Sequence, residues 1–314
     1  MVTTNFKSVV ELLDTFKDEQ SCIDHLEHLR WNGNVVSPFD PNSTVYKCKG
    51  NKYRCRNTGK YFNVKTNTLF DNTKISLRKW FVAIYIVTSH KKGISSVQLS
   101  KDINVTQKTA WFMLHRIRKC FGIENDNELN NTVEMDETYV GGKNKNRHAN
   151  KKVKHCQGRS SADKTPVFGM VERNGKLNAK VVADTSADTL TPEILKHVKN
   201  ATIYTDEYKG YNEVRQYYPH EIVKHKQYEY VRENIYTNTI EGFWALLKRG
   251  IIGIYHYVSK IHLQRYVDEF VFRYNTRGCS ECSRFNLLLQ NTEYRLTYKQ
   301  LIYGQNIYFN GSGN

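Results

Sequence analysis

Hydrophobic positions in the first third of the chain change between helical and extended spacing. Residues 45–70 read as short strands, separated by turn signals at Gly50-Asn51 and Thr58-Gly59. A helix is predicted from Ser76 to His90, with Ser76 as its N-cap. Another helix is predicted over residues 5–30 from apolar side chains at helical spacing, namely Val9, Leu12, Leu13 and Phe16.

Two further helices have the spacing of a helix-turn-helix motif. The first runs from Ser95 to Ile103, and the second begins after Thr106, a suitable N-cap, and runs to about Cys120. In such a motif the second helix enters the DNA major groove. The same pattern also fits an ordinary helical hairpin inside a larger domain. If the motif binds DNA, the residues that we expect at the contact are Gln107, Lys108, Thr109 and Arg116.

After residue 131 the pattern becomes one of strands and helices in alternation. The pair Asn174-Gly175 signals a hairpin between the second and third of these strands. Three antiparallel strands, a helix, two more strands and late helices are the order of a ribonuclease-H-like α/β fold, a mixed sheet flanked by helices. The strands are expected at 131–142, 165–175, 176–186, 201–211 and 220–231, and the helices at 187–199, 238–248 and 259–274.

These patterns predict five parts of the chain. The segment 124–131 (ENDNELNN) lacks apolar periodicity and is predicted to be a linker. The full division is an N-terminal helix with a small β module at 1–73, the helix-turn-helix region at 74–123, the linker at 124–131, the ribonuclease-H-like domain at 132–290 and a C-terminal tail at 291–314.

The charge of the chain indicates a polyanionic partner. Its 314 residues include 47 Lys or Arg and 31 Asp or Glu, for a formal net charge of +16. Residues 41–101 hold 13 basic residues and one acidic residue, and residues 143–164 hold eight and one. The second stretch is expected to be a loop beside the sheet. Its expected DNA contacts are Lys143, Lys145, Lys151 and Lys152.

A membrane is the less favoured partner. The longest apolar run, residues 80–87, is far shorter than the roughly 20 residues of a spanning helix. Acidic and basic residues interrupt the first twenty positions, so no secretion signal is expected. Seven sparse cysteines then fit reduced thiols in the cytoplasm better than a disulfide framework.

Three carboxylates occupy positions that would converge at one edge of the predicted sheet. Asp136 lies within the first strand, Asp206 at the end of the fourth, and Glu241 in the first turn of a late helix. Because such like charges repel, two Mg²⁺ or Mn²⁺ ions would neutralise them and form a two-metal site for phosphoryl transfer. Lys248 lies two helical turns after Glu241, where its ammonium could hold a phosphate.

Each of these residues also has a purely structural interpretation. Asp136 could lie on the solvent face of an edge strand, and Asp206 could cap a turn. Glu241 could form a capping box with Asn238, three residues earlier. Lys248 could be a solvated helix residue. The spacing alone leaves both interpretations open.

Several strings resemble bacterial insertion-sequence transposases of the DDE type, in the ISXO-type group. They include MDETYVGGK, KTPVFGMVER, YTDEYKGY and NTIEGFWALLKRGIIGIYH, and the resemblance covers roughly residues 15–277. It implies that Asp136, Asp206 and Glu241 bind the catalytic metal ions, with Asn238 in support, and that Lys248 is the basic residue of the site. It also implies a homo-oligomeric enzyme of the bacterial nucleoid that binds terminal inverted repeats, cleaves DNA strands with Mg²⁺ and transfers them to target DNA.

The N-terminal module departs from that family, whose members usually open with a zinc ribbon. The first ligand pair is replaced by SPFD at residues 37–40, and the second by CRNT at residues 55–58. A structural zinc ion needs four Cys or His ligands. We therefore expect a ribbon-shaped module without zinc.

Two other functions are compatible with the same fold. A DNA-binding regulator would keep the fold and lose the chemistry, although the intact carboxylates and Lys248 speak against it. A structure-selective nuclease would cut DNA without joining it. A Mg²⁺-dependent nicking assay separates the regulator from a transposase, and a joining assay with precut ends separates the nuclease.

Overall fold

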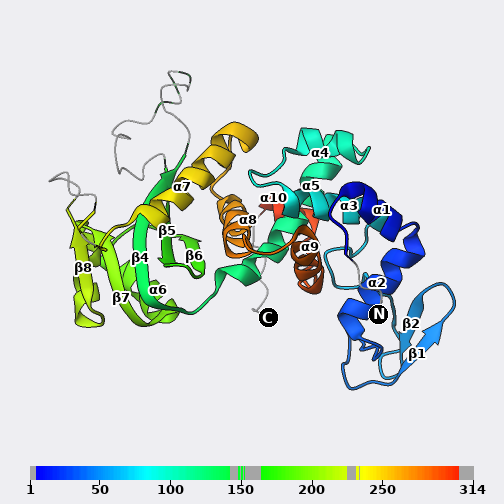
Figure 1. Ribbon diagram of the computed structural model, residues 1–314. Coiled ribbons are helices and arrows are strands. Elements are labelled where there is room, and N and C mark those ends of the chain that lie inside the picture. The colour runs from blue at the N-terminus through cyan, green and yellow to red at the C-terminus, as the bar shows by residue number, and fades with distance from the viewer. Residues whose placement is uncertain are drawn as a thin grey trace. The chain divides into compact units, whose positions relative to one another are not determined.

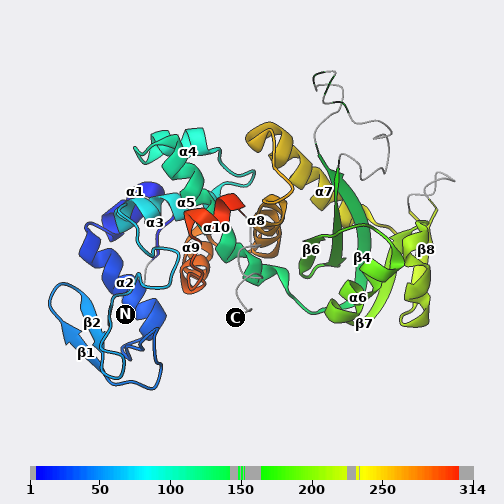
Figure 2. The same cartoon turned by 180° about the vertical axis from the view of Figure 1, so that it is seen from behind.

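A computed structural model of the chain describes residues 5–141, 148, 150, 152, 164–224, 231, 232 and 234–303. The chain forms two compact units, Met1–Cys120 together with Gly278–Asn314, and Phe121–Arg277 (Figure 1, Figure 2). Within the described residues, no helix has the length and apolar character that crossing a membrane requires.

The first unit combines helices with a small antiparallel sheet. The helix expected over residues 5–30 is two helices, because Asp18 caps a second one: its carboxylate accepts the Ser21 N–H at 2.7 Å. The helices are α1 (Val9–Thr15), α2 (Glu19–Trp31), α3 (Leu77–Ser89), α4 (Ser96–Asp102), α5 (Gln107–Cys120), α9 (Glu281–Gln290) and α10 (Tyr298–Tyr303). The sheet consists of β1 (Val45–Cys48), β2 (Lys52–Cys55) and β3 (Tyr61–Phe62).

The chain returns to this first unit after the second is complete. Phe285 of α9 packs against Phe6 and Phe81, with ring centroids 5.2 and 5.3 Å apart. The Leu69 N–H also donates to the Thr292 carbonyl at 2.7 Å. The boundary therefore falls at Gly278 and not at the expected residue 290, because the apolar face of α9 is buried against N-terminal helices.

The second unit is a mixed five-stranded sheet in the order β6-β5-β4-β7-β8. β4 pairs antiparallel with β5 and parallel with β7, β5 pairs antiparallel with β6, and β7 pairs parallel with β8. This arrangement confirms the ribonuclease-H-like fold class. The strands are β4 (Leu129–Val140), β5 (Thr165–Glu172), β6 (Leu177–Val181), β7 (Val198–Asp206) and β8 (His220–Val223).

Two local features account for the connections around β4 and β5. Asn174 adopts a left-handed conformation (φ 60°), and the Gly175 N–H donates to the Glu172 carbonyl at 3.0 Å, which closes the predicted hairpin. The expected linker is shorter than its composition suggests, because the 3-10 helix η1 (Phe121–Asn125) and the first residues of β4 occupy most of it.

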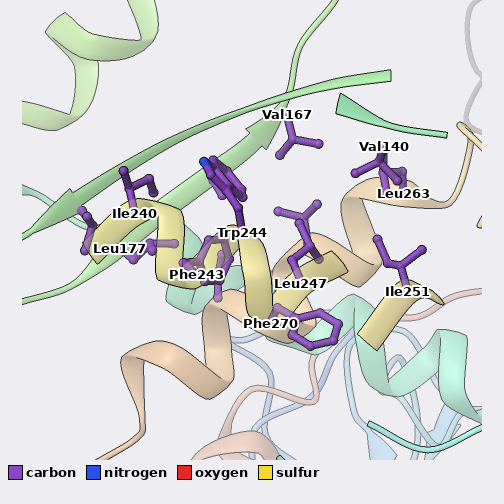
Figure 3. Packing of buried hydrophobic residues seen from close by; sticks show 14 residues of the cluster. Val140, Val167, Leu177, Ile240, Phe243, Trp244, Leu247, Ile251, Leu263 and Phe270 are labelled. Carbon is purple, nitrogen blue, oxygen red and sulfur yellow. The ribbon is translucent and has the colours of Figure 1, made fainter. Parts of the chain in front are cut away.

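Helices cover both faces of the sheet. Side chains alternate along β4, so Met135 joins the core beneath α6 and η4, while Val140 joins the core beneath α7 and α8 (Figure 3). The helical segments of this unit are α6 (Ala187–His197), the 3-10 helix η4 (Lys209–Gln216), α7 (Asn238–Gly250), the π-helix η6 (Ile251–Tyr255) and α8 (Leu263–Asn275).

Gly169 of β5 allows α7 to lie directly on the sheet. It pairs with Asp136 of β4. A Cβ atom at residue 169 would lie 2.5 Å from Cζ2 of Trp244 and 3.0 Å from Cδ1 of Ile240. The Trp244 ring occupies this space against the strands (Figure 3). Glycine at this position therefore allows the close approach of α7 to β5, the strand that pairs with the Asp136 strand.

We expect Gly169→Ala to lower the free energy of unfolding by about 1–3 kcal/mol, the usual cost of overfilling a packed core. Gly242→Ala is the matched control, because the Cβ position of Gly242 has open space around it. It should leave stability unchanged or raise it slightly, since alanine favours a helix. Urea unfolding measures both. Equal stability of Gly169→Ala and the wild type would contradict the close packing of α7 on β5.

Candidate active site

Asp136 and Asp206 lie on neighbouring parallel strands in matching register. The pairing of β4 with β7 places Glu134 opposite Tyr204. The same offset, continued for two residues, places Asp136 beside Asp206 on the face that also carries Glu134. Adjacent strands are ~4.8 Å apart, so these two carboxylates share one part of the sheet.

Glu241 reaches this face from the first turn of α7. The hydroxyl of Thr237, the N-cap residue of α7, donates to the Glu241 carboxylate at 3.1 Å. Ile240, the residue before Glu241, packs on Gly169, and Gly169 pairs with Asp136. Three separate elements thus bring the three predicted carboxylates to one region of the second unit.

The electrostatics of Asp136 reflect this grouping. Burial raises the pKa of Asp136, and the negative charges of Glu137, Asp206 and Glu241 raise it further, to about 8. A carboxyl group with this pKa retains its proton at neutral pH unless a cation replaces it. Asp136 therefore experiences the charges of both other predicted metal ligands.

The described residues hold no group of three or more Asp, Glu, His or Cys side chains already arranged as a metal site. One Asp206 carboxylate oxygen accepts the Tyr208 N–H at 2.9 Å, and Glu241 accepts from Thr237. Carboxylate oxygens are the donors that Mg²⁺ and Mn²⁺ prefer. The donor chemistry fits such an ion, and the side chains would have to turn toward it.

Two other predicted site residues lie on α7. Asn238 is its exposed first residue, and Lys248 is exposed in its last turn. Seven residues separate Glu241 from Lys248, which returns nearly to the same side of an α-helix. A phosphate held by Lys248 would therefore lie along the helix face that carries Glu241.

Two buried acids beside Asp136 were not singled out from the sequence. Glu134 is fully buried on the same face of β4, and Glu137 on the opposite face accepts the Tyr211 hydroxyl at 2.8 Å. Acidic residues are depleted in strands, so the run of Glu134, Asp136 and Glu137 in one strand was the signal that could have found them.

The first turn of α5 carries three of the four DNA-contacting side chains predicted from the helix-turn-helix motif. Gln107 and Lys108 are exposed and Thr109 is half-buried. Thr106 caps the helix by accepting the Thr109 N–H at 3.2 Å, as predicted. The Gln107 amide also donates to the Ser96 hydroxyl of α4 at 2.8 Å, which joins the two helices of the motif.

Arg116 does not fit the expected DNA contact. It is buried, with 6% of its surface exposed. Its guanidinium donates to the carbonyls of Leu296 and Asp71 at 3.0 and 2.8 Å. These bonds fix the C-terminal segment to the first unit. Arg116 is therefore a structural residue.

The basic stretch between β4 and β5 is only partly described. Lys152 is exposed, as a phosphate contact requires. Lys143, Lys145 and Lys151 lie outside the described residues. Their predicted contacts with DNA remain predictions.

Hydroxyl groups surround the buried thiol of Cys55 at the end of β2. Ser37 accepts the N–H groups of Phe39 and Asp40 at 3.2 and 3.4 Å. Burial alone raises the pKa of Cys55, but hydrogen bonds from Ser37, Ser43 and Thr58 outweigh it and lower the pKa to about 6. Hydroxyl groups of Ser37, Ser43 and Thr58 thus surround Cys55 in the module that resembles a zinc ribbon.

The raised pKa of Asp136 predicts a pH-dependent stability in metal-free protein. The group ionises near pH 4 in an unfolded chain and at about 8 when folded. The folded state therefore binds more protons between these values, so the contribution of Asp136 to stability falls as pH rises from about 4 to about 8. Asp136→Asn cannot ionise, so it should be more stable than the wild type at pH 8.

The stability gain of Asp136→Asn should shrink toward pH 4. Its upper bound is about 1.4 kcal/mol for each unit of pKa shift, reduced by solvent screening. Urea unfolding in EDTA at both pH values measures it, and Asp188→Asn, at an exposed position of α6, is the control. A gain for Asp136→Asn that is equal at both pH values would contradict a raised pKa.

Comparison with known proteins finds a family model that matches this unit. The family model of the ISXO2-like transposase domain matches residues 128–275, a range that contains Asp136, Asp206, Glu241 and Lys248. An uncharacterized protein in the transposable element ISH50 of Halobacterium salinarum is 26% identical over 275 residues, which cover 83% of this chain and 92% of that protein. Residues 128–275 of this chain therefore match the transposase domain of the ISXO2-like group.

Proposed function

We propose that this chain is a DNA transposase that binds the terminal inverted repeats of its element and catalyses Mg²⁺-dependent strand cleavage and strand transfer. The grouping of three carboxylates in the second unit is the main support for this proposal. Asp136, Asp206 and Glu241 come from β4, β7 and α7. Burial raises the pKa of Asp136, and the charges of Glu137, Asp206 and Glu241 raise it further. That grouping lies in a unit that matches a transposase domain.

In this proposal Asp136, Asp206 and Glu241 hold two Mg²⁺ or Mn²⁺ ions, with Asn238 as a supporting contact. Bound ions of this kind lower the pKa of an attacking hydroxyl and neutralise the leaving oxygen. Lys248 holds a phosphate oxygen by its charge. Asp136 would lose its proton when cations bind to the site. No zinc ion is part of the proposal.

Two displacements at phosphorus account for the reaction. In cleavage, a water oxygen forms a bond to the phosphorus and the bond to the 3′ oxygen of the element end breaks, which leaves a 3′-hydroxyl. In strand transfer, that hydroxyl oxygen forms a bond to a target phosphorus and a target 3′ oxygen leaves. Each step exchanges one P–O bond for another, so the chain needs no covalent intermediate and no ATP.

The charge distribution supports a DNA path along α7. Between Gly242 and Val267 the sequence has four Lys or Arg and no acidic residue. Lys248, Arg249 and Lys260 of this stretch are exposed. Phosphate contacts of this kind dominate the affinity for DNA. Pairing of two element ends requires more than one chain, so a homo-oligomer on DNA, within the bacterial nucleoid, completes the proposal.

Removal of any one of the three carboxylates should abolish strand cleavage. We expect Asp136→Asn, Asp206→Asn and Glu241→Gln each to lower the Mg²⁺-dependent cleavage rate at least about 10³-fold, because a two-metal site fails without one of its bridging charges. Binding to the inverted repeats should stay within about twofold. Asp188→Asn, on the exposed first turn of α6, should cleave normally.

A gel assay with a labelled element end measures cleavage, and the same assay with a precut end measures joining. Wild-type cleavage in any of the three variants would refute the site. Cleavage by the wild type without joining would instead identify a nuclease.

Two side chains of α5 should affect DNA binding in different ways. Lys108→Ala should weaken binding to all sequences alike and reduce the slope of log affinity against log salt concentration by about one. Gln107→Ala should reduce the preference for the inverted repeat over a scrambled duplex, because an amide can read a base edge. Fluorescence anisotropy at several salt concentrations measures both. Unchanged affinity and preference in both variants would exclude α5 as the reading helix.

A further inference from the structure

Glu134 is a buried carboxylate that none of the proposed catalytic steps uses. It lies on β4 two residues before Asp136, on the same face of the sheet, and is 0% exposed. A buried carboxylate is costly unless donors surround it. Its oxygens accept the Arg173 Nε–H at 2.7 Å, the Thr239 hydroxyl at 2.8 Å, and the N–H groups of Thr239 and Ile240 at 2.8 and 3.2 Å.

These contacts bind the start of α7 to β4. Thr239 and Ile240 belong to the first turn of α7, where the backbone N–H groups have no partner within the helix and the helix dipole favours a negative charge. A preceding residue usually caps such a turn. Here the N-cap residue Thr237 gives its hydroxyl to Glu241, and a carboxylate from the sheet accepts the amides instead.

Arg173 fixes the segment immediately before α7. It follows β5, and its guanidinium donates to the carbonyls of Asn234 and Tyr236 at 2.5 and 2.9 Å. The same group lies over the rings of Tyr236 and Tyr204, 3.6 and 4.7 Å from their centroids. The planar guanidinium can make these contacts and the bond to Glu134 together, which an ammonium cannot.

The position of Glu241 depends on this network. Glu241 follows Ile240, whose N–H is bound to Glu134, and Glu134 precedes Asp136 by two residues on a single strand. An enzyme loses activity when a supporting contact is lost and a catalytic group moves by about 1 Å. The network therefore ties one predicted metal ligand to another through one buried carboxylate.

We propose that Glu134 and Arg173 are positioning residues of the active site, which lock the first turn of α7 to β4 and so hold Glu241 against Asp136. The inference rests on the proposed function, because it assigns these residues a role in the same site. Neither residue needs to contact DNA or metal. Their effect is transmitted through the backbone of residues 237–241.

The test replaces the carboxylate by an amide of the same size. Glu134→Gln should increase hydrogen exchange at the first-turn amides of α7 and raise the Mg²⁺ concentration for half-maximal cleavage about 10-fold, the usual effect of losing a supporting contact of a metal ligand. Binding to the inverted repeat should not change. The readouts are exchange mass spectrometry of the peptide that contains residues 238–245, and cleavage over a Mg²⁺ titration.

Glu172→Gln is the matched control. Glu172 lies at the end of β5 and accepts the Asn131 amide at 2.9 Å, a contact that does not involve α7. This variant should keep wild-type exchange in α7 and the wild-type Mg²⁺ requirement. Two milder variants apply if Glu134→Gln does not fold. Thr239→Val removes one hydroxyl bond, and Arg173→Lys keeps the charge and loses the paired carbonyl bonds; both should raise the Mg²⁺ requirement in the same direction.

The outcomes separate this inference from the proposed function. A folded Glu134→Gln with the wild-type Mg²⁺ requirement overturns the positioning role, even if its stability falls. The same result in both milder variants overturns it as well. If the wild type cleaves no DNA at any Mg²⁺ concentration, the proposed function fails, and unchanged exchange in α7 of Glu134→Gln then overturns the contact itself.

Discussion

The close packing of α7 against the sheet is the constraint on which the rest of the second unit depends. A helix can approach two strands this closely only where a side chain is missing, and Gly169 provides that gap for Trp244. The packed face of α7 then determines where its other faces point. Glu241 and Lys248 lie on the side of α7 that faces away from the core and are exposed. The hydrophobic core therefore decides where the chemistry of this unit can occur.

A second constraint is the accumulation of negative charge at the middle of the sheet. Glu134, Asp136 and Glu137 lie within four residues of β4, and the structure accommodates each carboxyl group in a different way. Glu134 is neutralised by Arg173 and by helix amides, Glu137 accepts a tyrosine hydroxyl, and Asp136 has a raised pKa. A bound cation would stabilise the ionised form of Asp136 and so lower its raised pKa. That difference separates a proposed metal ligand from its structural neighbours better than sequence position does.

Much of the fold follows from local patterns. The succession of strands and helices along the second unit, the hairpin at Asn174 and the cap at Thr106 depend on short-range rules, and the structure contains all three. The burial of Arg116 and the return of α9 to the first unit depend on contacts more than a hundred residues apart, as between Arg116 and Leu296. No periodicity within one helix contains that information. The three carboxylates could be proposed from spacing and resemblance, whereas the role of Glu134 could be inferred only from its side-chain contacts.

The central claim is that Asp136, Asp206 and Glu241 form one cation site whose first ligand is protonated when the site is empty. Calorimetric titration of the protein with Mn²⁺ at pH 7, in two buffers of different ionisation enthalpy, measures binding and proton release together. The account predicts saturable binding with close to one proton released per chain, lost in Asp136→Asn, because the pKa of Asp136 is about 8. Binding without proton release, or unchanged binding and release in Asp136→Asn, would contradict it.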